Sequence, residues 1–231
     1  MIVREDVRSL IPPDLWQGSA PQEESRNLAG RSRLRAFRLA NGETALIREY
    51  RHGGLLRAVT GGVFLGRPLR PFRELAVTEE LRRRGFPTVE VYVACVRKVW
   101  GPFYRGWLVT RELDGARDFW AALNDGFVKG GNREEVLRAV GRSVRALHRE
   151  GVYHRDLNLK NILLREENGR IRGYVIDFDR AVLFLGGVPR PLAERNLERL
   201  LRSALKLDPE RKLLAPDAWA ELVRCYREAD E

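Results

Sequence analysis

The chain has 231 residues, 44% of them hydrophobic, which is enough apolar material for a folded core and excludes an intrinsically disordered protein. Its 42 Lys and Arg residues outnumber the 32 Asp and Glu residues and give a net charge of +10. Such a charge favours an anionic partner, for example nucleic acid, acidic lipid head groups or a phosphorylated glycan, although an Arg-rich surface of solvated charges accounts for it about equally well.

The sequence carries no sign of a secretory signal or of a membrane-spanning segment. Residues 1–13 contain several charges and no apolar run, and the longest uncharged apolar stretch, residues 181–189, is too short to cross a bilayer. Cys95 and Cys225 match no metal-binding spacing, so we expect reduced thiols. We therefore expect a cytoplasmic protein, or one that attaches peripherally to a membrane face.

The first part of the chain predicts a β-hairpin after an N-terminal segment without a readable pattern. Residues 1–27 mix prolines and charges without sustained periodicity, and we assign them no role. The turn pair Asn41-Gly42 joins two strand-like runs, which is a hairpin signature. Gly30, just before the hairpin, could open a loop that covers a phosphate group, but a plain turn accounts for a single glycine as well.

Arg48 lies at the end of the second strand-like run, where its positive charge could bind phosphate groups. The alternative is an exposed arginine on an edge strand. A helix is predicted to begin near Pro71 and to stop at Gly85, and Glu74 within it is our candidate for an ion-pair partner of Arg48. The alternative carboxylates on the same helix are Glu79 and Glu80.

Two further strands and a connecting segment follow this helix. Residues 87–99 and 103–110 have strand character, so they would complete a small, mostly antiparallel sheet. The connection after them contains Glu112 and Leu113, whose backbone groups could hydrogen-bond to the edge of an adenine.

Helices dominate the rest of the chain. Asn132 is a favourable N-cap for a helix that runs to Gly151. Its apolar stripe consists of Val136, Leu137, Val140, Val144 and Leu147. Two more helices are predicted over residues 194–207 and 218–226. The residues expected to face inward in the last helix are Trp219, Leu222, Val223 and Tyr226.

One stretch between these helices carries a chemical pattern. It reads HRDLNLKN over residues 154–161, and Asp177 follows after an apolar run and a predicted β-hairpin. Phosphoryl transfer needs a carboxylate that orients the attacking hydroxyl and accepts its proton, and Asp156 could do this. Mg²⁺ needs hard oxygen ligands, which Asn161 and Asp177 could supply. The pattern therefore predicts an ATP-dependent kinase.

The same stretch is also compatible with a purely structural role or with an inactive protein. His and Asp often serve as turn residues or caps, and a kinase fold that has lost activity would keep the same pattern. We expect His154 to be a packed, hydrogen-bonded residue that holds the loop rather than a proton-transfer group. Few residues separate Asp177 from the next predicted helix, which argues against a regulated protein kinase.

Four segments resemble the bacterial Kdo kinases, which group with the heptose kinases in a lipopolysaccharide-core kinase family. The similarity runs from about Gly30 to Lys206. It is carried by residues 48–55, 148–161, 176–180 and 196–203, of which the last three segments are the most specific.

The resemblance implies an α+β, two-lobed protein-kinase-like fold. Residues 28–112 would form a small N-lobe built on an antiparallel sheet, and residues 113–231 would form a mostly helical, minimal C-lobe. Residues 1–27 would remain a separate N-terminal segment.

The resemblance also implies roles for individual residues. Asp156 would be the catalytic base, and Asn161 and Asp177 would be ligands of Mg²⁺. Arg48 and Glu74 would clamp ATP. Further nucleotide-binding positions would be Gly30, Glu112 and Leu113. Supporting positions would be His154, Asn158, Asp179 and Arg180.

The implied reaction is ATP-dependent phosphorylation of a Kdo hydroxyl on a lipid A precursor at the inner face of the cytoplasmic membrane. The partners would be a lipid-anchored anionic glycan of the Kdo-lipid A type and an anionic membrane surface, with no nucleic acid. Alternatives are a heptose kinase of the core, an antibiotic- or choline-type small-molecule kinase, an atypical protein kinase, and an inactive kinase-like binding module.

Arginines around the helix predicted near Pro71 could attach the chain to anionic lipid, although a solvated helix face accounts for them at least as well. These arginines are Arg67, Arg70, Arg73, Arg82, Arg83 and Arg84.

Overall fold

A computed structural model describes residues 1–11, 24–26, 34–51, 62–66, 69–125, 127 and 132–228. The chain divides into two units. One comprises Met1–Glu80 and Val89–Glu112, and the other comprises Leu81–Thr88 and Leu113–Glu231. Gly30 and Arg67, which the sequence singled out, lie outside the described residues.

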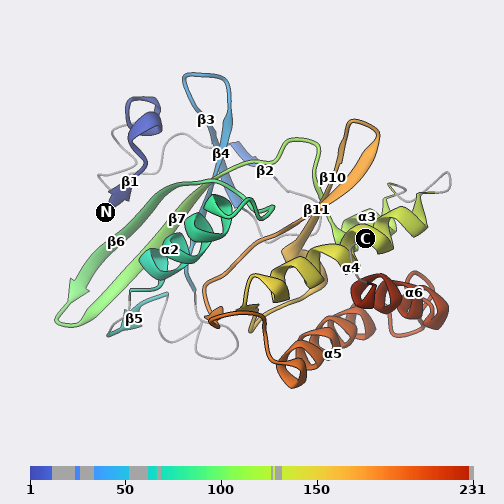
Figure 1. Cartoon of the computed structure of the whole chain (residues 1–231). Helices are drawn as coiled ribbons and strands as arrows, with labels where there is room; N and C mark the ends of the chain where they lie inside the picture. The colour runs from blue at the N-terminus through green and yellow to red at the C-terminus, as the bar shows by residue number, and fades with distance from the viewer. Residues whose placement is uncertain are drawn as a thin grey trace. The chain divides into compact units, whose positions relative to one another are not determined.

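The first unit is built on a seven-stranded sheet in which neighbouring strands pair antiparallel. The strand order is β1-β6-β7-β4-β3-β2, and β5 pairs with β7 beside this path (Figure 1). The strands are β1 (Ile2–Val3), β2 (Glu24–Arg26), β3 (Leu34–Arg38), β4 (Thr44–Glu49), β5 (Phe64–Leu65), β6 (Val91–Trp100) and β7 (Phe103–Arg111). The predicted hairpin of β3 and β4 is confirmed, with Phe37 opposite Ala45, and so are the two later strands β6 and β7.

The N-terminal segment contributes to this sheet although its sequence shows no pattern. β1 pairs along β6, with Ile2 opposite Ala94. The short 3-10 helix η1 (Glu5–Leu10) buries Val7, and Ile11 follows it into a cluster of apolar side chains of the sheet. A two-residue strand is too short to produce the alternation by which strands are predicted.

Helix α2 (Arg70–Arg83) covers one side of the same sheet. Alternate residues of the central strands enter two apolar clusters, with Val109 of β7 in one and Leu108 in the other. Phe72 and Leu75 of α2 pack against the second cluster. The helix predicted to start near Pro71 is therefore confirmed, close to its predicted bounds.

The second unit is mostly helical, as expected (Figure 1). Its helices are α3 (Phe119–Asn124), α4 (Arg133–Arg149), α5 (Arg190–Leu207) and α6 (Pro216–Arg227). Three strands form the sheet β11-β10-β8, and β12 pairs with β9. The strands are β8 (Arg117–Asp118), β9 (Val152–Tyr153), β10 (Ile162–Glu167), β11 (Arg170–Val175) and β12 (Val182–Leu183), and a 3-10 turn, η3, covers Leu159–Asn161.

Two of the predicted helices differ from expectation at their N-terminal ends. The whole apolar stripe of α4 is buried, as predicted. Asn132 is the N-cap residue, as predicted, and its carbonyl oxygen accepts the first helical hydrogen bond from the N–H of Val136 at 2.9 Å. Among the described residues, however, its side chain makes no capping hydrogen bond. Helix α5 begins at Arg190, before the predicted residue 194, because Pro191 is compatible with the first turn of a helix.

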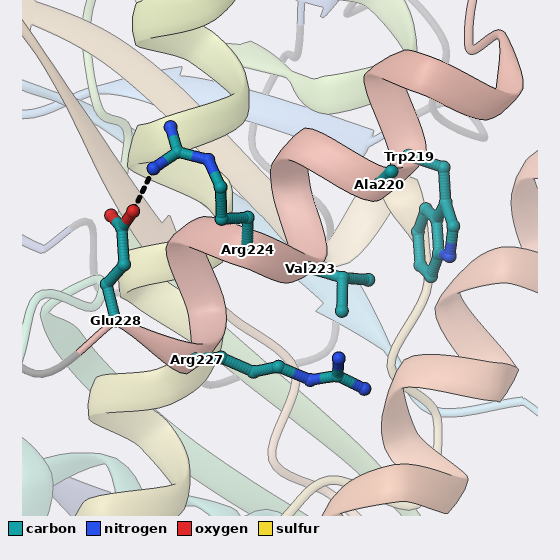
Figure 2. A pocket seen from close by; sticks show the side chains of 6 residues that line it. All are labelled: Trp219, Ala220, Val223, Arg224, Arg227 and Glu228. Atoms are coloured by element: carbon teal, nitrogen blue, oxygen red, sulfur yellow. Dashed lines mark hydrogen bonds and ion pairs between the residues drawn. The ribbon is translucent and has the colours of Figure 1, made fainter.

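The last helix, α6, is rotated relative to the prediction. Leu222 is buried as predicted, but Trp219, Val223 and Tyr226 are only half-buried. The other buried residues of the helix are Ala218 and Cys225. Figure 2 shows Trp219 and Val223 lining a surface pocket on α6, beside Arg224.

A buried histidine connects three helices of the second unit. Nδ1 of His148 in α4 lies 2.9 Å from the hydroxyl of Tyr226 in α6, and its Nε2 lies 3.1 Å from Oδ1 of Asn196 in α5. Because the amide oxygen can only accept, Nε2 carries a proton and donates it to Asn196, and in the neutral ring Nδ1 accepts from the Tyr226 hydroxyl. Burial lowers the pKa of His148 to about 4, so the ring is neutral at pH 7.

A glycine-dependent contact in this unit involves the segment between β12 and α5. The N–H of Phe184 donates to the carbonyl of Gly151 at 2.8 Å, and the N–H of Val188 donates to the carbonyl of His148 at 2.8 Å. Gly151 has a φ of 76°, and a Cβ there would lie 2.3 Å from the carbonyl oxygen of Gly186. Main-chain atoms therefore hold this segment against the end of α4, and only glycine fits.

We expect the free energy of unfolding to fall as the pH drops from 6.5, the ordinary pKa of His148, to about 4, its folded-state pKa. In this window the unfolded chain binds a proton at His148 that the folded chain excludes. The contribution of neutral His148 to stability is fully present above its unfolded-state pKa. Between the two pKa values, one such proton makes the free energy of unfolding change by about 1.4 kcal/mol per pH unit. Urea unfolding across this pH range should show a shallower slope for His148→Gln than for the wild type, and equal slopes would contradict the buried neutral ring.

We also expect Gly151→Ala to lower the free energy of unfolding by about 2–4 kcal/mol, because the new methyl group meets carbonyl oxygens and the backbone is left-handed. Gly169→Ala is the matched control: its φ is 74°, but nothing lies within 4 Å of a Cβ there, so backbone strain of about 1 kcal/mol is expected. Urea unfolding of both variants measures the difference. Equal losses would show that the close approach at Gly151 has no cost.

Candidate active site

The loop at residues 154–161 combines a buried apolar anchor with an exposed carboxylate. Both leucines of the HRDLNLKN sequence are fully buried, while Asp156 is exposed. Asn158 stabilises the loop in two ways: its Nδ2 donates to the carbonyl of Asp156 at 2.9 Å, and its Oδ1 accepts from the N–H of Lys160 at 2.9 Å. The Asp156 carboxylate thus projects from a fixed main chain and is accessible to another molecule.

His154 holds this loop and the strand end before Asp177 together. Its Nε2 lies 3.0 Å from the carbonyl oxygen of Ile176 and donates to it, while its Nδ1 accepts from the N–H of Asp156 at 3.2 Å. The side chain is 1% exposed, and burial lowers its pKa, against the opposing effect of the Asp177 and Asp156 charges. His154 is therefore a packed, hydrogen-bonded residue, as predicted, and its ring is neutral although the charges of Asp156 and Asp177 favour protonation.

The hairpin of β10 and β11, also predicted, brings the residue before Asp177 to Asn161. The N–H of Ile176 donates to the carbonyl of Asn161 at 3.0 Å. The Asn161 side chain is buried, and its Nδ2 donates to the carbonyl of Asp156 at 2.9 Å. This orientation assigns the amide oxygen of Asn161 as its remaining acceptor, which is the atom that a cation would need.

Asp177 has a left-handed backbone, which is rare for a residue with a side chain. Its φ is 70°. The next residue, Phe178, is 1% exposed, and its ring centroid lies 5.6 Å from that of His154. Strained backbone of this kind persists where the surrounding contacts determine it, and it is frequent at functional sites. Asp179 and Arg180 follow, half-buried and exposed respectively, and their supporting role stays a prediction.

Asn196 of α5, the first residue of the fourth segment that carries the family resemblance, is a supporting residue to which the sequence analysis assigned no role. It is fully buried, its Oδ1 accepts from the N–H of His154 at 3.1 Å, and its Nδ2 donates to the carbonyl of His154 at 2.8 Å. The same Oδ1 accepts from His148. One signal could have found it, because a polar residue on the apolar face of a predicted helix needs a buried partner.

The first unit pairs Arg48 with Glu74, as predicted. Nη2 of Arg48 forms an ion pair with Oε1 of Glu74, and the hydroxyl of Tyr50 donates to Oε2. Glu74 is 2% exposed, and the Arg48 guanidinium lies 4.9 Å from the centre of the Tyr50 ring. The structure thus selects Glu74 over the two other carboxylates of α2 as the partner and fixes the direction of the Arg48 side chain.

The connection after β7 already uses two of its backbone groups. The N–H of Glu112 donates to the carbonyl of Thr44 at 2.9 Å, and the carbonyl of Leu113 accepts from the N–H of Ala116 at 3.1 Å. The Glu112 carbonyl and the Leu113 N–H are therefore the groups that would be directed to an adenine, which stays a prediction.

Arg70 and Arg84, both proposed to contact lipid, make contacts within the protein. The Arg70 guanidinium lies over the Phe64 ring, 4.4 Å from its centre, and over the Tyr50 ring, 5.5 Å from its centre. Nη1 of Arg84 lies 3.4 Å from a carboxylate oxygen of Glu150.

The side-chain oxygen atoms of Asn161 and Asp177 suit a Mg²⁺ ion that takes its other ligands from water and phosphate groups. Among the described residues, no group of three His, Cys, Asp or Glu side chains could hold a metal. Mg²⁺ commonly takes one or two protein ligands and completes its shell with water and phosphate oxygens. The amide oxygen of Asn161 and the carboxylate of Asp177 suit this mode of binding.

The chain resembles known proteins in sequence and in fold. Residues 16–226 match the model of the lipopolysaccharide kinase (Kdo/WaaP) family. A 3-deoxy-D-manno-octulosonic acid kinase of Xylella fastidiosa is 34% identical over 216 residues, which cover 91% of this chain and 80% of that protein. Another of this name, from Pasteurella multocida, is 30% identical over 190 residues, which cover 80% of this chain and 76% of that protein.

A solved structure described as WaaP in complex with acyl carrier protein has the same fold. It aligns with a TM-score of 0.60 at 21% identity and covers 99% of this chain and 89% of that one. This alignment confirms the expected α+β, protein-kinase-like fold, and the sequence matches confirm the family resemblance drawn from the four segments. The chain belongs to the lipopolysaccharide kinase (Kdo/WaaP) family.

Proposed function

We propose that this chain transfers the γ-phosphoryl group of ATP to a hydroxyl of 3-deoxy-D-manno-octulosonic acid (Kdo) in the inner core of lipopolysaccharide. The observation that carries the proposal is that the buried His154 hydrogen-bonds to the main chain of both Asp156 and Ile176. These two hydrogen bonds fix Asp156, the proposed base, relative to Ile176, which directly precedes the proposed metal ligand Asp177. The names of the relatives from X. fastidiosa and P. multocida supply the acceptor sugar.

Asp156 would orient the acceptor hydroxyl and take its proton as the oxygen attacks the γ-phosphorus. The new oxygen–phosphorus bond forms while the bond to the ADP oxygen breaks. Asn161 and Asp177 would hold Mg²⁺, which supplies positive charge to the phosphate oxygens when it is bound.

Arg48 would direct its guanidinium to the phosphates of ATP. Its partner Glu74 is buried and also accepts from Tyr50, so the pair is positioned before any ligand arrives. An arginine offers several N–H groups in a planar fork, and a fork can donate to two phosphate oxygens at once.

A heptose kinase of the core is the alternative within the family, and the names of the relatives favour Kdo. A peptide substrate is disfavoured by the short path from Asp177 to α5, which begins at Arg190. This path consists of residues 178–189, which include β12 and the segment held against Gly151.

The proposed acceptor is anchored in lipid, and we place the reaction at the inner face of the cytoplasmic membrane. Among the described residues, no helix combines the length and apolar character needed to span a bilayer. The net charge of +10 supports attraction to an anionic leaflet, to which each nearby Lys or Arg adds about 1 kcal/mol.

We expect Asp156→Asn to lower kcat for Kdo phosphorylation by about 100-fold or more, because the amide keeps the shape of the side chain but cannot accept the proton. The affinity for ATP, measured by calorimetry, should stay close to that of the wild type. Asp217→Asn, which changes an exposed acid on α6, is the control and should leave kcat unchanged. A wild-type rate in Asp156→Asn would refute the assignment of the base.

We expect Asp177→Asn to weaken the binding of ATP in the presence of Mg²⁺ by about tenfold or more, because the metal loses the charged one of its two proposed protein ligands. Binding of ATP in the presence of EDTA should change little. Calorimetric titrations under both conditions test this without any turnover. An equal loss of affinity with and without Mg²⁺ would show that Asp177 contacts the nucleotide or the fold rather than the metal.

A further inference from the structure

The end of the β6–β7 hairpin exposes a group of large apolar side chains that the proposed chemistry does not use. We call these residues the hairpin tip: Leu65, Val99, Trp100 and Phe103. The exposed fractions are 73% for Trp100, 68% for Leu65 and 51% for Val99. Side chains of this kind are costly to leave in water, and a cluster of them marks an interaction surface.

Strand pairing gathers these residues in one place. Phe103 of β7 has a partner on each side: Trp100 is opposite it in β6, and Leu65 is opposite it in β5. The rings of Trp100 and Phe103 stack at 17°, with their centroids 5.9 Å apart. Because β4 pairs with β7 only from Trp107 onwards, the hairpin extends beyond the central strands (Figure 1). The tip is thus a projecting apolar surface rather than part of a core.

The hairpin that carries the tip is exclusively basic. Residues 91–111 contain Arg97, Lys98, Arg105 and Arg111 and no Asp or Glu. Arg97 and Lys98 are exposed directly beside Val99 and Trp100. A projecting tryptophan flanked by cations complements a surface that is apolar inside and anionic outside.

We infer that the hairpin tip inserts into the interfacial layer of an anionic lipid membrane. Trp100 and Leu65 would enter the boundary between head groups and acyl chains, and Lys98 would stay with the lipid phosphates. The inference rests on the proposed function, since a lipid-anchored acceptor must be met at a membrane face. A second copy of the chain fits this surface poorly, because two identical basic hairpins would repel each other.

The test measures binding of the full chain to vesicles by co-sedimentation. The vesicles consist either of phosphatidylcholine alone or of phosphatidylcholine mixed with phosphatidylglycerol. We expect binding to the mixed vesicles that weakens with salt, and a loss of about tenfold in affinity for Trp100→Ser, whereas Trp100→Phe should bind almost as the wild type. Lys98→Ser should bind more weakly and with a smaller salt dependence.

Ile2→Ser is the matched control, since Ile2 is another exposed apolar residue of the same sheet, at 48%, and pairs with β6 far from its tip. This variant should bind vesicles like the wild type. Thermal unfolding of each variant checks that the fold is kept. The inference is overturned if Trp100→Ser binds as tightly as the wild type, or if Trp100 instead controls self-association in sedimentation velocity while vesicle binding stays unchanged.

A kinase assay separates this inference from the proposed function. With free Kdo in water, Trp100→Ser should turn over at the wild-type rate, and with Kdo-lipid A in mixed vesicles it should be about tenfold slower. Failure of the wild type on both acceptors would refute the proposed function. Vesicle binding that still depends on Trp100 would then support the membrane contact on its own.

Discussion

The arrangement of the candidate site depends on one buried neutral imidazole. His154 donates to the carbonyl of Ile176 and accepts from the N–H of Asp156, so a single ring links two segments that are distant in sequence. A charged ring could not do both, because protonated Nδ1 would face a donor. Burial keeps the ring neutral, and that neutrality positions Asp156 and the backbone before Asp177.

This linkage continues away from the site through hydrogen bonds. Asn196 binds both backbone polar groups of His154, and His148 joins Asn196 to Tyr226 near the C-terminal end of the chain. Each side-chain nitrogen and oxygen of these residues has at least one partner, and a buried polar network that is satisfied in this way stabilises one conformation. The loop at residues 154–161 is therefore supported by α4, α5 and α6, and the first unit positions Arg48 by similar means through Glu74.

Much of this could be predicted, because the loop, the hairpin to Asp177 and the stripe of α4 are local patterns in the sequence. The choice of Glu74 among three carboxylates also followed from its place on the predicted helix. The role of Asn196 could not be assigned in this way, since it depends on contacts with His154 and His148, which lie 42 and 48 positions away along the chain. The rotation of α6 was missed for a related reason. Close packing on α4, where a Cβ on Gly141 would lie 2.7 Å from the Leu222 carbonyl, decides which face is buried.

At Gly151 the position of a neighbouring segment is determined by main-chain contacts rather than by the side chains of that segment. The segment between β12 and α5 is held by carbonyl and amide groups, through Phe184 and Val188, and by the absence of a side chain at Gly151 itself. Leu183 and Leu185, by contrast, are exposed and take little part in holding it. Replacing these two side chains should therefore leave the main-chain contacts of the segment in place. The course of this stretch, which pairs through β12 with the strand that leads into residues 154–161, is thus independent of the side chains that it presents to solvent.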